Sequence, residues 1–118
     1  MHRLERLTIW HRANALARAS YRLTLDPPLD RHFGLADQIR RAGISIPANL
    51  AEGYGLGTTP QLIRCTRIAL ASCYELRVHL QIAHDMGLAT DDSAEPVLAL
   101  AEEVVRMLIG MLKGLQRR

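Results

Sequence analysis

Arginine is the residue type with the clearest chemical use in this chain. Fourteen of its fifteen Lys and Arg residues are arginine. The planar guanidinium donates in pairs to phosphate or carboxylate oxygens, so it suits both a nucleic-acid backbone and an internal ion pair. Residues 1–67 hold ten basic and five acidic residues, a net charge of +5, whereas residues 68–118 hold five and seven, a net charge of −2. A basic N-terminal half is compatible with a phosphate-bearing partner. The candidate contacts are Arg12, Arg18, Arg22, Arg40, Arg41, Arg64 and Arg67.

The sequence offers little for catalysis, metal binding or nucleotide binding. His79 and His84 are five residues apart, not the four that place two ligands on one helix face, and no Glu-x-x-His motif occurs. Glycines alternate along residues 53–57, but no predicted strand precedes them and no Gly-Lys-Ser/Thr follows, so a phosphate-binding loop is not predicted. We therefore expect a protein that is not an enzyme and binds no cofactor or metal ion.

Composition points to a single helical domain that covers residues 1–118. Apolar residues make up 48% of the chain, which excludes a disordered protein, and aromatic residues make up only 4%, which favours helices over a sheet. No run of 18 apolar residues occurs and the N-terminus has no apolar segment after its charges, so we expect no membrane span and a cytoplasmic location. Cys65 and Cys73 are about 12 Å apart along one predicted helix, too far for a disulfide, and are predicted to be buried reduced thiols.

Four helices are predicted from apolar periodicity and from start and stop signals. The Asp26-Pro27-Pro28 sequence ends the first helix, and Gly53 is predicted to cap the second, which Pro47 is predicted to kink. Thr58 and Asp92 each have a Gln or Glu three residues later, so each is predicted to begin a helix with a capping box. The predicted helices cover residues 4–25, residues 35–53, residues 58–86 and the chain from about residue 92 onward.

Apolar stripes on these helices predict which faces form the core of an up-and-down bundle. On the first helix the stripe consists of Leu7, Trp10, Ala13, Ala17 and Tyr21, widened by Ile9 and Leu16. On the third it consists of Leu62, Cys65, Ala69, Ser72, Leu76, Leu80 and Ala83. Small residues in the middle of the third stripe predict that a neighbouring helix approaches closely there.

The last helix carries two apolar stripes, about 100° apart. The first consists of Leu98, Ala101, Val105, Leu108, Leu112 and Leu115. Such a combined arc is too wide for one side of a monomeric bundle, so the sequence predicts a homo-oligomer in which a second copy covers the other stripe. The predicted oligomer interface consists of Val97, Leu100, Val104, Met107 and Met111.

A polar row interrupts the middle of the chain. Within residues 40–53, Arg41, Asn49 and Glu52 lie near one helical face. We interpret this row as a hydrogen-bonded seam between helices rather than a catalytic site. A carboxylate buried at such a seam needs a partner, so Glu52 or Glu75 is predicted to pair with Arg41 or with the arginine before it.

The same stretch carries a resemblance to a known family. The matching residues are Gln38, Arg40-Arg41-Ala42, Ser45-Ile46-Pro47-Ala48-Asn49, Ala51-Glu52-Gly53, and, outside this stretch, Trp10, Ala13, Leu16, Tyr21, Ile68-Ala69, Ser72, Glu75 and Leu76. In these residues the chain resembles the four-helix-bundle family typified by the intervening-sequence protein of bacterial 23S ribosomal RNA genes. The resemblance implies a compact bundle that assembles into a ring of five. A similar architecture occurs in the accessory protein of diversity-generating retroelements, whose ring binds nucleic acid and a reverse transcriptase.

Three functions remain open at this point. We favour association of a homo-oligomer, a pentamer by resemblance, with nucleic acid, and with RNA more than DNA, through the seven arginines given above. The resemblance also allows an accessory subunit that holds a reverse transcriptase on its template RNA. The third interpretation is a structural assembly module without a nucleic-acid ligand.

Overall fold

Four long helices and the loops between them make up this protein. The computed structural model describes residues 2–117, with side chains from Leu4 onward. The elements are α1 His2–Glu5, α2 Thr8–Leu23, the 3-10 helix η1 Leu29–Arg31, α3 Phe33–Leu56, α4 Thr59–Asp85 and α5 Asp91–Gln116. No strand occurs within these described residues, so the predicted all-α chain with four main helices is confirmed.

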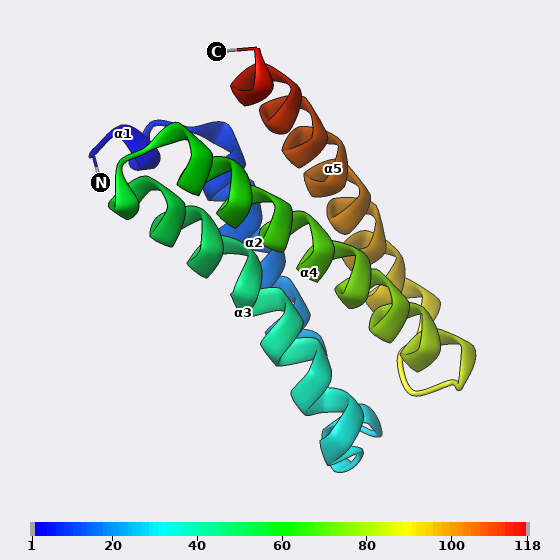
Figure 1. Cartoon of the computed structure of the whole chain (residues 1–118). Helices are drawn as coiled ribbons and strands as arrows, with labels where there is room; N and C mark the ends of the chain where they lie inside the picture. The colour runs from blue at the N-terminus through cyan, green and yellow to red at the C-terminus, as the bar shows by residue number, and fades with distance from the viewer. Residues whose placement is uncertain (1, 118) are drawn as a thin grey trace.

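Successive long helices run antiparallel, as the colour along the chain shows in Figure 1. α3 and α5 each pack against both α2 and α4, so α2 and α4 lie diagonally across the bundle. The α2–α3 and α4–α5 connections share one end of an elongated molecule of 45 × 21 × 20 Å, and we call it the loop end. The other end holds the α3–α4 connection and the last turns of α5, and we call it the open end.

One apolar face of each helix forms the core. The predicted stripe of α4 is confirmed, because all seven of its residues are buried. On α2, Ile9, Ala13 and Leu16 of the widened stripe are buried as predicted, and Leu23 outside it is buried too. Tyr21 lies instead at the edge of the core, with 40% of its surface exposed.

The predicted first helix, residues 4–25, is divided in two. α1 ends at Glu5, Leu7 has an extended backbone with φ −86° and ψ 129°, and α2 begins only after it. The break turns the chain so that Leu4 is completely buried in the core. Burial of an apolar side chain thus outweighs the continuation of the helix.

The end of α3 differs from the prediction that Gly53 caps it. α3 continues through Pro47 and Gly53, and Gly57, with φ 82°, provides the left-handed cap. Gly53 is required by packing instead, because a Cβ atom there would lie 2.9 Å from Cβ of Cys65 and 2.9 Å from Cδ1 of Leu62. The two helices thus approach closely at Leu62 and Cys65, at the start of the α4 stripe and not in its middle, where the sequence predicts it. The kink at Pro47 stays a prediction.

The starts of α4 and α5 depend on threonine side chains. Thr58 accepts a hydrogen bond from the backbone N–H of Gln61, so the predicted cap of α4 is confirmed. α5 begins earlier than predicted, because Thr90 is its cap and accepts from the N–H of Ser93 at 3.2 Å. Asp92 lies inside the first turn of α5, where its charge favours the helix N-terminus.

The second apolar stripe of α5 is covered within a single chain. α5 contacts both α2 and α4, so its wide apolar arc is shared between two neighbours. Val97 and Val104 are buried, and Leu100, Met107 and Met111 are partly buried against the core. The premise that this stripe needs a second copy is therefore wrong. Large exposed apolar side chains lie instead on α4, at Ile68, Tyr74, Val78 and Ile82, at Met86 directly after it, and elsewhere in the described chain.

Candidate nucleic-acid interface

Arg12 is used to hold two helices together. Its Nε and Nη2 atoms donate to the two carboxylate oxygens of Glu103, at 3.1 and 2.6 Å, which joins α2 to α5. The hydrogen bond from Arg12 lowers the pKa of Glu103, and the same bond raises the pKa of Arg12. Because the Nε–Nη2 edge of the guanidinium is engaged by a carboxylate, Arg12 cannot use that edge for a paired contact with a phosphate.

Arg40 fixes the packing of α3 against the end of α2. Its Nε donates to Oγ1 of Thr24 at 2.7 Å, and its guanidinium lies over the ring of Tyr21, 4.6 Å from the ring centre. Thr24 is buried and donates in turn to the carbonyl of Tyr21. Arg40 therefore acts as a structural residue at the edge of the core, with a cation–π contact as part of its role.

The predicted pairing of a carboxylate with an arginine across α3 and α4 is wrong. Arg41 pairs with Asp37, one turn earlier on α3, at 2.8 Å, and both side chains are mostly exposed. Glu75 points outward from α4 and pairs with His79 at 3.3 Å. An exposed carboxylate keeps its water shell, so it does not need the arginine that a buried one would require.

A polar seam does connect α3 to α4, but through smaller side chains. The hydroxyl groups of Ser45 and Ser72 are 2.8 Å apart across the helix interface. Asn49 donates to the carbonyl and to the hydroxyl of Ser45, one turn away on α3. The predicted hydrogen-bonded seam is therefore present, with Asn49 in it, while Arg41 and Glu52 lie exposed outside it.

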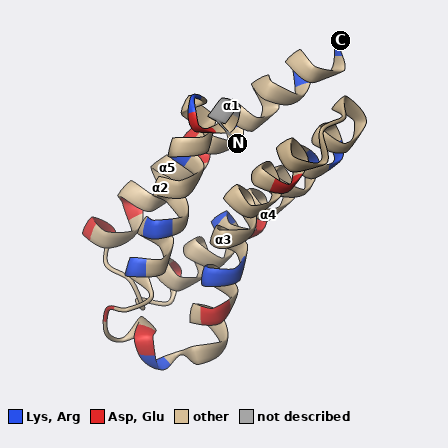
Figure 2. Ribbon diagram, turned by 90° about the vertical axis from the view of Figure 1, so that its left-hand side faces the viewer, with Lys and Arg blue, Asp and Glu red and all other residues tan. Residues whose placement is uncertain are grey.

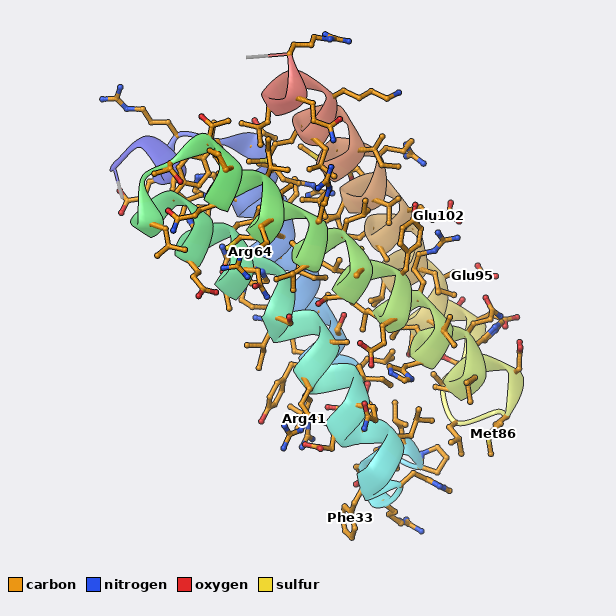
Figure 3. All side chains as sticks on the ribbon, viewed as in Figure 1. Phe33, Arg41, Arg64, Met86, Glu95 and Glu102 are labelled. Atoms are coloured by element: carbon orange, nitrogen blue, oxygen red, sulfur yellow. The ribbon has the colours of Figure 1, made fainter. Side chains whose placement is uncertain are left out.

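The four remaining candidate arginines are exposed but do not form one surface. Arg18 and Arg22 lie on α2, whereas Arg64 and Arg67 lie on α4. None of the four side chains has a hydrogen bond or ion pair with another residue of the described chain. Because α2 and α4 are diagonal in the bundle, these two pairs face different sides of the molecule. Figure 3 shows Arg64 on α4 and, farther along the bundle, Arg41 on α3.

Arg64 and Arg67 lie toward the open end, which also holds basic residues of α5 that were not among the predicted contacts. Residues 53–74 and 104–117 contain no Asp or Glu, and the antiparallel arrangement places them side by side. A groove of about 660 Å³ lies between them, with Ile63 and Arg67 on one wall and Leu115 and Gln116 on the other. We call the exposed basic side chains of this region the basic end: Arg64, Arg67, Arg106, Lys113 and Arg117.

The basic end cannot be recognised from the net charge of each half of the chain. The C-terminal half has a net charge of −2 because all seven of its acidic residues lie between residues 75 and 103. In Figure 2 the last turns of α5, next to the C-terminus, carry basic but no acidic residues. Of the five side chains, Arg106 lies near Glu103 and helps to lower its pKa, while the other four have no such neighbour among the described residues.

The loop end of α4 and α5 has the opposite charge. Residues 75–102 hold six acidic residues and one arginine, Arg77, which pairs with Glu102 at 3.1 Å. Nε2 of His84 forms a short hydrogen bond to Asp91 across the α4–α5 connection. This hydrogen bond, with the charges of Asp91, Asp85 and Glu95, raises the pKa of His84. The histidine thus ties the end of α4 to the start of α5.

Reactive groups are few in the described part of the chain. Cys65 and Cys73 are buried and unpaired, as predicted, and burial raises the pKa of the Cys73 thiol to about 11. Among residues 2–117, no three His, Cys, Asp or Glu side chains lie together so that they could hold a metal ion. No described helix is long and apolar enough to cross a membrane.

Comparison with known proteins finds a matching family model and a similar solved structure. The family model described as 23S rRNA-intervening sequence protein matches residues 5–110. A crystal structure from Bacteroides thetaiotaomicron VPI-5482, of a protein with unknown function from the S23 ribosomal protein family, is similar with a TM-score of 0.81. The two sequences are 23% identical, and the match covers 90% of this chain and 99% of that chain. No functionally curated protein matches this chain.

The fold and its surface define a four-helix-bundle protein with a basic and an acidic end along one helical hairpin. The family match extends over most of the chain, and the similar structure has the same fold. The chain belongs to the 23S rRNA-intervening sequence protein family, which confirms the resemblance found in the sequence.

Proposed function

We propose that this protein is a non-enzymatic RNA-associated protein that assembles with copies of itself. The observation that carries the proposal is the basic end, where five exposed basic side chains lie on two neighbouring stretches without an Asp or Glu. The family takes its name from an intervening sequence of 23S rRNA, which favours RNA over DNA. Four of the five side chains are arginines, which suit bidentate contacts to phosphate.

Self-association would strengthen this binding. One copy offers at most five basic contacts at the basic end, and the same copy presents an acidic surface at its loop end. Several copies in one assembly bind a single RNA with higher avidity than one copy can achieve. The family resemblance implies a ring of five, and we take this as the proposed assembly.

Fluorescence anisotropy with labelled RNA, and with DNA of the same sequence, tests the proposal. Arg67→Gln and Lys113→Gln each remove one charge from the basic end and are expected to weaken RNA binding several-fold. Arg31→Gln is the matched control, because it removes one exposed arginine in η1, at the loop end. Absence of RNA binding by the wild type at low salt would refute the proposal and favour a structural assembly module.

A further inference from the structure

The groove at the open end combines apolar walls with basic side chains. It has a volume of about 660 Å³ and lies between the first turns of α4 and the last turns of α5 (Figure 1). Pro60, Ile63 and Leu115 supply apolar surface to it, while Arg67 and Gln116 supply polar groups. A volume of this size lies within the range of sites that bind small organic groups. The groove thus offers a ligand more than a contact to phosphate.

The charged side chains that the two helices bring to this groove are all basic. Arg67 lies on its α4 wall, and on α5 Lys113 lies about one turn before Gln116. The side chains of Arg67, Lys113 and Gln116 have no hydrogen bond or ion pair with another described residue. Residues 53–74 and 104–117 contain no Asp or Glu, so no carboxylate of these stretches competes with a bound anion. By charge complementarity, the occupant of the groove carries negative charge.

A second groove between α4 and α5, nearer the loop end, has a different charge. It has a volume of about 420 Å³, with Val78 and Leu98 among its apolar residues. Glu102 also lines it and pairs with Arg77, which is the one arginine among the lining residues. An anionic ligand is therefore expected to select the groove at the open end.

An unpaired nucleotide has both chemical parts that this groove fits. Its base is a flat group with apolar faces and polar edges, and its phosphate is negatively charged. In a duplex the base faces are covered by stacking, so a duplex would contact the basic side chains but not the apolar walls. In loops, bulges and strand ends the base can leave the stack and lie against a protein surface. Apolar walls beside Arg67 are therefore useful for unpaired RNA and not for a duplex.

We propose that the groove at the open end binds one unpaired nucleotide of RNA, with the base against Ile63 and Leu115 and the adjoining phosphates at Arg67 and Lys113. Gln116 also lines the groove, and its amide can donate to or accept from the polar edge of the base. This inference rests on the proposed function and specifies it further. The protein selects RNA with unpaired nucleotides over a continuous duplex.

Fluorescence anisotropy with two labelled RNAs tests this inference on the wild type. The first is a blunt duplex, and the second is the same duplex with unpaired adenines bulged from the middle of one strand. The two RNAs have almost the same charge and the same ends, so contacts to phosphate alone would bind them equally. The bulged RNA is expected to bind at least about fivefold more tightly, because its unpaired base gains contact with the apolar walls.

Ile63→Asn removes apolar surface from the groove without a change in charge. It is expected to lower the affinity for the bulged RNA about fivefold and to leave the affinity for the blunt duplex unchanged. Ile68→Asn is the matched control, because Ile68 is 38% exposed on the same helix and does not line the groove. This control is expected to leave both affinities unchanged. Circular dichroism confirms that both variants keep their helices, and the comparison of the two RNAs on the wild type does not depend on either variant.

The possible results separate this inference from the proposed function. Equal affinity of the wild type for the two RNAs, or an equal loss in the Ile63→Asn and Ile68→Asn variants, would overturn the inference and leave RNA association standing. A smaller mass of the Ile63→Asn variant in light scattering would show that another copy of the chain covers the groove, which would also overturn the inference. Absence of binding to either RNA at low salt would overturn the proposed function as well.

Discussion

Arg12 donates to a glutamate that lies 91 residues later in the sequence, while Arg40 lies over a tyrosine and Arg64 projects into solvent. The sequence identifies all three as arginines on helices and assigns the same role to them. What separates them is the neighbour that the tertiary fold supplies, which no local pattern contains. Arg12 and Arg40 therefore have structural roles and are removed from the predicted phosphate-binding residues. The proposed set includes exposed basic side chains of α5 in their place.

His84 provides a test of the electrostatics at the loop end. Its pKa is raised above the ordinary value of 6.5, mainly by the hydrogen bond to Asp91. A group whose folded pKa is raised stabilises the fold fully below its unfolded pKa, and this contribution is lost as pH rises through the folded pKa. The melting temperature of His84→Gln should therefore fall furthest below wild type near pH 6, and the difference should shrink as the pH rises through the raised pKa of His84. A difference that does not change with pH would show that the hydrogen bond does not depend on the charge of His84.

Alanine substitutions at two glycines separate the effect of close packing from the effect of helix propensity. Gly53→Ala should lower the free energy of unfolding by about 1–2 kcal/mol, because its Cβ would come within 2.9 Å of Cys65 and Leu62. Gly110 lies in α5 with no atom within 4 Å of an added Cβ. Gly110→Ala should raise the free energy of unfolding by about 0.5–1 kcal/mol, as alanine favours a helix over glycine. Urea denaturation measures both, and equal effects of the two changes would contradict this account.

The helices themselves were largely predictable from the sequence, while their ends and outer faces were less so. The stripe of α4 and its cap at Thr58 follow from local periodicity and from one side chain. The second apolar stripe of α5 was predicted to be covered by another copy. An apolar arc that contacts two neighbouring helices has the same sequence pattern whether the second helix belongs to the same chain or to another. The break before α2 depends on the burial of Leu4, a tertiary effect that the sequence does not display.

The start of α5 tests the corrected helix boundary. Thr90→Ala removes the side chain that accepts from the N–H of Ser93 and should cost about 1 kcal/mol of stability. Asp92→Ala removes a charge and an acceptor from the first turn without removing the cap, and it should cost only a few tenths of a kcal/mol. Thermal denaturation compares the two variants. A larger loss for Asp92→Ala than for Thr90→Ala would show that Asp92 is the cap, as predicted from the sequence.

At the scale of the whole molecule, basic and acidic side chains are separated by their position in the bundle. The two halves of the sequence do not describe this separation. The basic end combines residues of α4 with residues about 40 to 50 positions later on α5, because the two helices are antiparallel. The loop end has a basic α2–α3 side and an acidic α4–α5 side. The proposed function uses the basic end of this arrangement for RNA.

The measurement that tests this account most directly is the salt dependence of RNA binding. The affinity of the wild type should fall steeply with salt, and removing three charges in an Arg64→Gln, Arg67→Gln, Lys113→Gln variant should lower the slope of log K against log salt. Each phosphate that is no longer neutralised by a basic side chain lowers that slope by about 0.7–0.9. An equally steep slope in the variant, with unchanged affinity, would contradict the assignment of RNA binding to the basic end.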